Sequence, residues 1–165
     1  MAVTRGLIKI HWPVEEPSNI NYGVASGAVQ TIVAGSPTKV GTVGNVVPMV
    51  DGDGTTSQRF TGIAKNDSSD TATVAGIVAV YLPLPGLIYE CAAKTASLAN
   101  TAALISALVY KRVKFGLVSS TTWTIDTAQS DATTNGIVIL GGDPNTSTIF
   151  FAVSPQITIF DNPTT

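Results

Sequence analysis

Side chains branched at Cβ dominate this chain, since 54 of its 165 residues are Val, Ile or Thr. Branching at Cβ restricts χ1 and suits the pleated, half-buried surface of a sheet. The chain has by contrast only one His, one Cys and three Glu. Because these residue types carry much of the acid–base, nucleophilic and metal chemistry of proteins, the composition predicts a structural or binding protein and no enzyme.

Charged residues make up 12% of the chain, about half of the roughly 25% that is typical of soluble domains. The mean hydropathy is +0.31 and the net charge is −2. This balance predicts substantial contact surface, as in homo-oligomers and components of lattices. The mild acidity argues against nucleic acid as a partner, because no basic stripe is available to displace counterions from phosphates.

The cysteine count and the hydropathy profile bear on location. Cys91 is the only cysteine, which excludes an intrachain disulfide and suits synthesis in a reducing cytoplasm. Residues 1–10 contain two basic side chains and no uninterrupted apolar core, so no secretory signal is expected. The uncharged stretch 71–89 is interrupted by Pro83 and Pro85 and predicts a buried strand with a turn, not a membrane helix.

Short apolar runs separated by Gly, Pro, Asn and Asp predict many strands joined by tight turns. The run 74–82 is nearly continuous in apolar residues and predicts a central strand buried on both faces. The spacing of the runs favours a sandwich or a barrel over a parallel α/β sheet. The predicted strands cover residues 29–33, 38–40, 46–50, 60–65, 74–82, 87–93, 112–118, 122–125, 137–140, 148–153 and 156–160.

One helix is predicted near residues 101–110. Asn100 or Thr101 can cap its first turn, and three alanines favour the helical backbone. Its apolar side chains recur at the spacing of one buried stripe. They are Leu104, Ile105, Leu108 and Val109.

Residues 1–22 predict an extended N-terminal arm with a short strand at 6–11. Pro13 and Pro17 disfavour helix and central strand alike, and no partner strand is identifiable nearby in the sequence. The arm carries Ile10 and Trp12, whose burial is worth about 1.5–3 kcal/mol each, so it is expected to dock on a neighbouring subunit or particle. Residues 23–165 then form one β-rich domain.

The most metal-like motif is Asp51-Gly52-Asp53-Gly54-Thr55, which resembles the start of a calcium loop. An EF-hand loop needs a glycine at its sixth position and an acidic ligand at its twelfth. Those positions are Thr56 and Gly62, so the motif fails. Asp-Gly pairs are also favoured in tight turns, and a turn without metal is predicted.

The remaining reactive side chains are expected to have structural roles. His11 lies in the predicted arm, and a mobile arm is a poor catalytic scaffold. Cys91 alternates with apolar neighbours and is expected to be a small buried hydrophobe. Lys111, Arg112 and Lys114 follow the predicted helix and are interpreted as partners of its dipole, with a phosphate site as the alternative. No catalytic, cofactor-binding or metal-binding residue is therefore predicted.

An alternative use of the aromatic side chains is a sugar-binding platform of the kind found on β-sandwich modules. The candidates for stacking are Trp123, Tyr81, Tyr89 and Tyr110. Aromatics make up only 7% of the chain, so packing in the core and at sheet edges is the competing interpretation.

Three segments between about residues 24 and 95 resemble the head decoration, or cement, proteins of tailed bacteriophages. The first is an Ala-Gly-x-Pro-x-x-Val strand and turn at 32–40, followed by 46–51. The second is a Phe-Thr-Gly strand at 59–64 that leads through 67–71 into 76–80. The third is the Pro-Leu-Pro-Gly corner at 83–86 with the strand 88–94.

The resemblance implies a small structural protein that binds the outside of an assembled icosahedral shell and stabilises contacts between capsid subunits. It implies the major capsid protein as partner, a homo-oligomer with a trimer favoured, and a place on the virion exterior after synthesis in the bacterial cytoplasm. The alternatives are another virion component, such as a tail, fibre or receptor-binding part, and a carbohydrate-binding β-module.

The expected fold is mainly β: a single compact β-sandwich or β-barrel (β-tulip-like) domain with one short helix near 101–110 and the extended N-terminal arm. No cofactor, nucleic acid or membrane is expected as a partner. The helix and the strands that follow it lie outside the segments that carry the resemblance.

Overall fold

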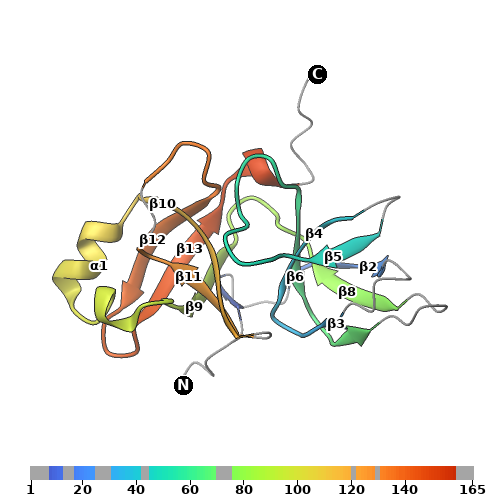
Figure 1. Ribbon diagram of the computed structural model, residues 1–165, viewed down its shortest axis with the longest axis horizontal. Helices are drawn as coiled ribbons and strands as arrows, with labels where there is room; N and C mark the ends of the chain where they lie inside the picture. Colours follow the sequence, from blue (N-terminus) through green and yellow to red (C-terminus); the bar gives the residue numbers. More distant parts are fainter. Residues whose placement is uncertain are drawn as a thin grey trace.

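The computed structural model describes residues 8–12, 17–24, 31–41, 45–69, 76–119, 122–128 and 131–158. Within these ranges the protein is mainly β, with two large antiparallel sheets and one α-helix, which confirms the predicted fold class. The two sheets form the two ends of the molecule in Figure 1, and α1 lies at the outer tip of the larger one.

The larger sheet has six strands and curls around its own core. A parallel bridge between Ala93 and Ile125 joins β11 at one edge of the sheet to the end of β9 near the other edge. The strands β9, β13, β12, β10 and β11 therefore curve around one face of the sheet. In spatial order the strands are β1 (Lys9–Trp12), β9 (Ile88–Ala92), β13 (Thr148–Val153), β12 (Ile137–Asp143), β10 (Arg112–Ser119) and β11 (Thr122–Asp126).

The smaller sheet has five strands and closes in the same way, because a parallel bridge from Val24 to Val46 joins its two edges. A two-stranded ribbon and two 3-10 turns complete the described structure. The sheet contains β2 (Asn19–Gly23), β8 (Ile77–Tyr81), β6 (Phe60–Ala64), β4 (Pro37–Val40) and β5 (Val46–Pro48). The ribbon pairs β3 (Thr31–Ile32) with β7 (Ser68–Ser69), and the 3-10 turns are η2 (Ala96–Leu98) and η3 (Pro155–Ile157).

Phe60 joins the two sheets. Its ring lies 5.8 Å from that of Phe115 and 6.5 Å from that of Tyr89, both in the larger sheet. Phe60 and Ile63 are three residues apart in β6, yet both belong to the larger core. A register shift between β4 and β6 adds one residue to β6 at this point, and such a bulge re-aims side chains.

Helix α1 (Ala102–Leu108) confirms the predicted helix but ends two residues early. The Thr101 side chain accepts a hydrogen bond from the Leu104 backbone N–H at 3.2 Å, so Thr101 is the cap of the two that were predicted. Ile105 and Leu108 are buried in the larger core. The backbone turns at Val109 instead of continuing the helix.

The expectation of a strand buried on both faces at 74–82 is wrong. β8 begins at Ile77 within the described residues and lies in the sheet interior between β2 and β6. Its side chains alternate: Val78 and Val80 are fully buried, whereas Ile77 is 67% exposed. A continuous apolar run reveals strand propensity but not whether a second layer covers it.

Two further strand predictions, at 137–140 and 156–160, differ from the structure. A turn was expected after residue 140, but β12 continues through Gly141 and Gly142 past a bulge and pairs with β13. A strand was expected at 156–160, but Pro155 begins the 3-10 turn η3, and Thr158 makes only an isolated bridge to Phe60. Residues 159–160 lie outside the described structure.

The described parts of the segment 1–22 are extended, but they have partner strands in the same chain. β1 pairs with β9 and β2 pairs with β8. Ile8 is 2% exposed and belongs to the larger core. The short strand expected at 6–11 is found at Lys9–Trp12, and the partner strands that were not identifiable nearby in the sequence are β9 and β8, far along the chain.

Candidate functional site

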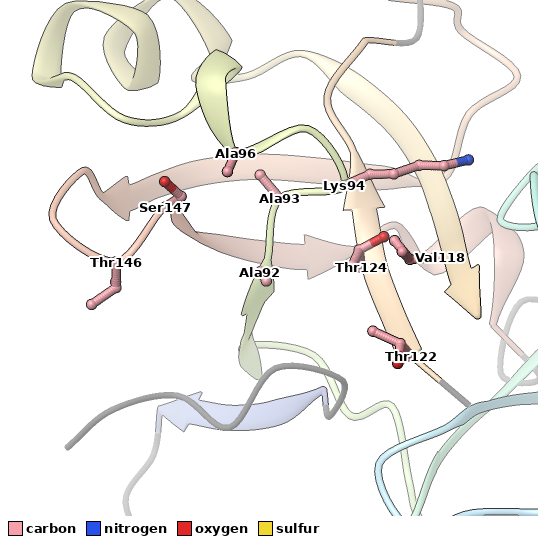
Figure 2. Close-up of a pocket in the computed structure, with 9 residues that line it drawn as sticks. All are labelled: Ala92, Ala93, Lys94, Ala96, Val118, Thr122, Thr124, Thr146 and Ser147. Atoms are coloured by element: carbon pink, nitrogen blue, oxygen red, sulfur yellow. The ribbon is translucent and has the colours of Figure 1, made fainter. Parts of the chain in front are cut away.

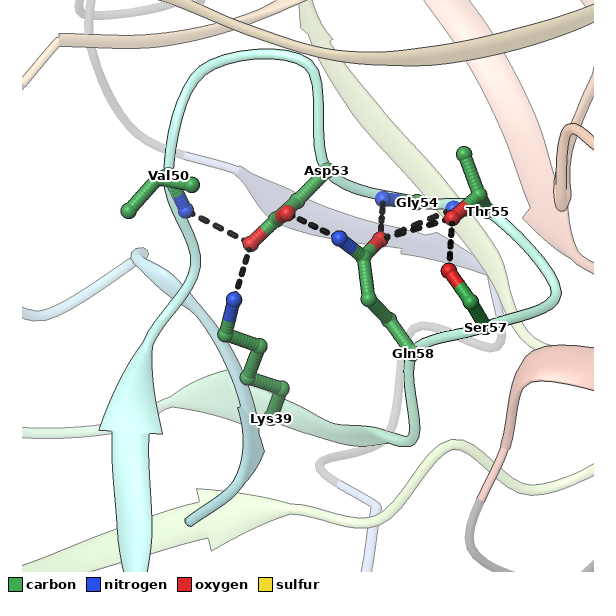
Figure 3. A network of polar contacts seen from close by, with 7 residues as sticks. All are labelled: Lys39, Val50, Asp53, Gly54, Thr55, Ser57 and Gln58. Atoms are coloured by element: carbon green, nitrogen blue, oxygen red, sulfur yellow. Dashed lines mark hydrogen bonds and ion pairs between the residues drawn. The ribbon is translucent and has the colours of Figure 1, made fainter.

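The loop 50–58 carries the Asp-Gly motif and joins β5 to β6 in the smaller sheet, and Figure 3 shows its polar contacts. Asp53 is 3% exposed. Its carboxylate accepts hydrogen bonds from Lys39 Nζ at 2.7 Å, from the Val50 backbone N–H at 2.8 Å and from the Gln58 amide. Gln58 in turn accepts from the Gly54 backbone N–H at 2.7 Å. Both carboxylate oxygens of Asp53 therefore have hydrogen-bond donors from the protein, and the side chain has a structural role in the turn that the sequence predicts.

Backbone hydrogen bonds attach this loop to β10. The Gly52 N–H donates to the Phe115 carbonyl at 3.1 Å, and the Phe115 N–H donates to the Asp53 carbonyl at 2.8 Å. Gly54 has φ of +106°, and a Cβ there would lie 3.3 Å from the side chains of Phe115 and Ile137. Glycine is therefore needed for both the conformation and the close approach.

Asp51, Lys94 and Asp126 extend the connection on the surface. Asp51 accepts from the Leu117 backbone N–H at 2.7 Å and from Lys94 Nζ at 3.0 Å. Lys94 Nζ also lies 3.4 Å from Asp126. The pKa of Asp51 is lowered mainly by the hydrogen bond from the Leu117 N–H and next by the hydrogen bond from Lys94. The hydrogen bond to Asp51 in turn raises the pKa of Lys94. We call residues 50–58, with Lys39, Lys94 and β10, the seam.

His11 is part of a strand pairing. Its Nδ1 lies 2.8 Å from Glu90 Oε2, and its ring stacks on Phe150 with the centroids 4.1 Å apart. Among the described residues no group of three His, Cys, Asp or Glu side chains is placed to hold a metal ion. The arrangement therefore fixes β1 against β9 and β13.

Cys91 is fully buried, which confirms the prediction of a small hydrophobe. Burial raises the pKa of the thiol, so the nucleophilic thiolate is suppressed in the folded protein. The neighbouring Tyr89 is 1% exposed, and burial raises the pKa of its hydroxyl as well. That hydroxyl has no hydrogen-bond partner among the described residues.

The four candidate aromatic residues do not form one exposed platform. Tyr89 and Trp123 are buried at 1% and 3% exposure. Tyr81 is half-buried, with Lys65 Nζ 5.6 Å from its ring centroid. Tyr110 is the exception at 76% exposure. The aromatic residues therefore pack mainly in the core, as the competing interpretation held.

The basic cluster is also placed differently from the expectation. Because α1 ends at Leu108, no basic residue lies in its last turn, and the interpretation as partners of the helix dipole is wrong. Arg112 and Lys114 lie in β10, and the Arg112 guanidinium donates to the Thr133 carbonyl at 3.2 Å. Lys111 is exposed.

A small pocket opens where β9 and β11 separate (Figure 2). Its volume is about 130 Å³, below the range of about 300–1,000 Å³ that is usual for ligand sites. The Lys94 side chain extends away from Thr146 and Ser147. Apart from Lys94, the pocket is lined by short side chains, several of them with hydroxyl groups. The lining residues are Ala92, Ala93, Lys94, Ala96, Val118, Thr122, Thr124, Thr146 and Ser147.

Large apolar side chains are exposed at several places on the strands and loops. Ile77 is 67% exposed, Val118 59%, Trp12 56% and Val50 55%. Of these side chains, only Trp12 was expected from the sequence to contact another molecule, because Ile77 and Val118 lie in apolar runs that predict burial. They are the most prominent candidates for contact with another molecule.

No protein-family model matches this chain, and the search of curated proteins finds no match. Among the described residues no helix has the length and apolar character needed to cross a membrane.

Proposed function

We propose that this protein is a structural virion component that binds the outer surface of an assembled phage capsid and stabilises contacts between capsid subunits. The resemblance of residues 24–95 to head decoration proteins suggests this function. The observation that carries it is the set of exposed apolar side chains on a β framework with few charges: Ile77, Val118, Trp12 and Val50.

These side chains are suited to binding because they stand on an ordered framework. Ile77 lies in β8, Trp12 in β1 and Val118 in β10, so little conformational entropy is lost when a partner covers them. Removing apolar surface from water stabilises by about 25 cal/mol per Å². Several such contacts, repeated over a symmetric shell, add up to firm attachment.

The seam supports the same function mechanically. It joins the two sheets through the partly buried pair of Lys39 and Asp53 and through the backbone of β10. A connection that resists separation of the two ends lets one molecule bridge neighbouring capsid subunits. In this proposal the protein acts on the capsid exterior, with the major capsid protein as partner and a homotrimer as the assembly state.

The test is co-sedimentation with undecorated shells assembled from the major capsid protein of the same phage, combined with the melting temperature of those shells. We expect the protein to sediment with the shells and to raise their melting temperature. Ile77→Lys should weaken attachment, because it places a charge where an apolar contact forms, while the matched control Lys65→Arg should bind normally. Absence of wild-type attachment, or no change in shell melting, would contradict the proposal.

A separate measurement addresses the assembly state. Analytical ultracentrifugation of the free protein is expected to show a trimer, or a monomer that becomes trimeric only on the shell. A particle reconstruction with isolated, non-touching copies would contradict the trimer and leave the attachment to the shell intact.

A further inference from the structure

Tyr110 occupies a backbone position that normally requires glycine. The Lys111 N–H donates to the Leu108 carbonyl at 3.0 Å, and Val109 has φ of −57° and ψ of 134°. These values define the first half of a type II turn, whose next residue needs positive φ and is usually Gly or Asn. That residue is Tyr110, with φ of +66°.

A second motif makes the same demand of Tyr110. The Tyr110 N–H donates to the Ile139 carbonyl at 2.7 Å, and the Ile139 N–H donates to the Lys111 carbonyl at 3.1 Å. Two residues of one strand thus face one residue of the other, as in a G1 bulge, where the first residue is typically a left-handed glycine. A bulky aromatic residue in this conformation is a strained exception.

Packing does not account for the tyrosine. Its side chain is 76% exposed, the largest value among the exposed apolar residues, and no described ring stacks on it. A residue that strains the backbone without contributing burial points to a role outside the fold, and strain of this kind collects at functional sites.

The chain segment that leads through α1 to Tyr110 carries no charge, and we call α1, Tyr110 and Leu140 the distal cap. No charged residue occurs between Lys94 and Lys111. Leu104 is 37% exposed, and Leu140, which follows the carbonyl that binds the Tyr110 N–H, is 38% exposed. The outward residues of α1 are Ala102, Ala103, Ser106 and Ala107. Figure 1 shows α1 at the tip of the molecule, remote from the smaller sheet.

We propose that Tyr110 is an anchor that inserts into an apolar groove with an acidic rim on the capsid shell. An apolar groove would be complementary to the distal cap, which has no charges. An acidic rim would be complementary to Lys111, which is exposed and has no ion pair within the described structure. Tyrosine is enriched among residues that dominate binding energy, because it provides a large contact area with little loss of conformational entropy. This inference rests on the proposed function.

The size of the distal cap argues against a second copy in solution as its partner. Its seven-residue helix is only about 10 Å long. A patch on that scale falls short of the roughly 800 Å² per partner that a stable dimer buries. It suits one contact among several on a shell, where simultaneous attachments reinforce each other.

The experiment compares Tyr110→Gly, Tyr110→Asn and Tyr110→Phe in thermal unfolding and in co-sedimentation with undecorated shells. Gly and Asn relieve the strain, so we expect each to raise the melting temperature by about 2–4 °C. Both lack the ring, so we expect each to weaken attachment by about tenfold or more. Tyr110→Phe keeps the ring and the strain and should leave the melting temperature unchanged and attachment within about threefold. Lys111→Gln should reduce the salt dependence of attachment.

The outcomes separate this inference from the proposed function. If the wild-type protein binds shells and Tyr110→Gly binds equally well, the anchor is refuted while the decoration function stands. If Tyr110→Gly lowers the melting temperature, the tyrosine serves the fold, which also overturns the inference. If the wild-type protein does not bind shells at all, both proposals fail.

Discussion

The seam and the distal cap meet the same backbone requirement with opposite residues. In the seam, Gly52 and Gly54 occupy positions of positive φ, and each side-chain oxygen of Asp53 has a donor. In the distal cap, Tyr110 occupies such a position and its side chain extends into solvent. The seam therefore serves the stability of the fold, whereas the distal cap accepts backbone strain and displays a side chain.

The largest expected effect is at the centre of the seam. Asp53→Ala should lower the free energy of unfolding by about 3 kcal/mol, because it leaves Lys39 and the Val50 N–H without their buried acceptor. Chemical denaturation measures this loss. Asp53→Asn is the matched control and should lose less, since its amide oxygen can still accept one hydrogen bond. An Asp53→Ala protein as stable as wild type would show that the loop does not hold the sheets together.

The second largest effect is expected when a glycine of the seam is given a side chain, the opposite of replacing Tyr110 by glycine in the distal cap. Gly54→Ala should destabilise by about 1–2 kcal/mol, because it adds a Cβ at a φ of +106° within 3.3 Å of Phe115. At Tyr110, by contrast, substitution by glycine is expected to stabilise. Gly86, with φ of +88° and open space around it, is the control that separates backbone strain from crowding. If Gly54→Ala costs no more than Gly86→Ala, crowding against β10 is not part of the effect.

A smaller effect concerns the response of the seam to acid. The pKa of Asp51 is lowered in the folded protein, so its stabilising contribution is present above its ordinary pKa of 3.8 and is lost as the pH falls further. Asp51→Asn should therefore reduce the loss of melting temperature between about pH 4 and pH 2. The pKa of Lys94 is raised, so its contribution is full below 10.5 and disappears only at more alkaline pH.

Because Asp51 is 55% exposed, solvent screens its ion pair and the change should be modest. Asp143, whose contacts lie within its own turn, is the control site. A wild-type acid response that Asp51→Asn leaves unchanged would assign that response to other carboxylates.

The smallest effect is expected in the core between the two regions. The Tyr89 hydroxyl is buried without a described hydrogen-bond partner, so Tyr89→Phe removes an unsatisfied group and keeps the ring. The free energy of unfolding should stay the same or rise by up to about 1 kcal/mol. A loss of more than about 1 kcal/mol in chemical denaturation would reveal a hydrogen bond to that hydroxyl, for example through a bound water.

Much of the fold was predictable because its signals are local. β-Branched runs that end in turn residues identified most strands, including β13 at 148–153. Thr101 was one of two candidate helix caps, with Asn100, on the basis of its chemistry and its position before an apolar stripe. Cys91 was predicted to be buried because it alternates with apolar neighbours in a predicted strand.

The misplaced features depend on partners that are distant in sequence. The apolar run that contains Ile77 does not show whether a second layer covers it. A short strand was predicted at 6–11, where β1 begins at Lys9, but neither its pairing with β9 nor the strand β2 was predicted, because the partners β9 and β8 are far along the chain. The strain at Tyr110 was also hidden, since its φ follows from a turn after α1 and a bulge against β12.

The mainly β fold with one capped helix follows from the sequence alone, because side-chain branching, turn residues and capping act over a few residues. Which apolar side chains are covered and which are displayed depends on the folded structure. The role of Asp53 in the seam and the strained turn at Tyr110 depend on it too. These properties depend on which strands meet, and that pairing is settled by long-range packing and hydrogen bonding across the whole chain.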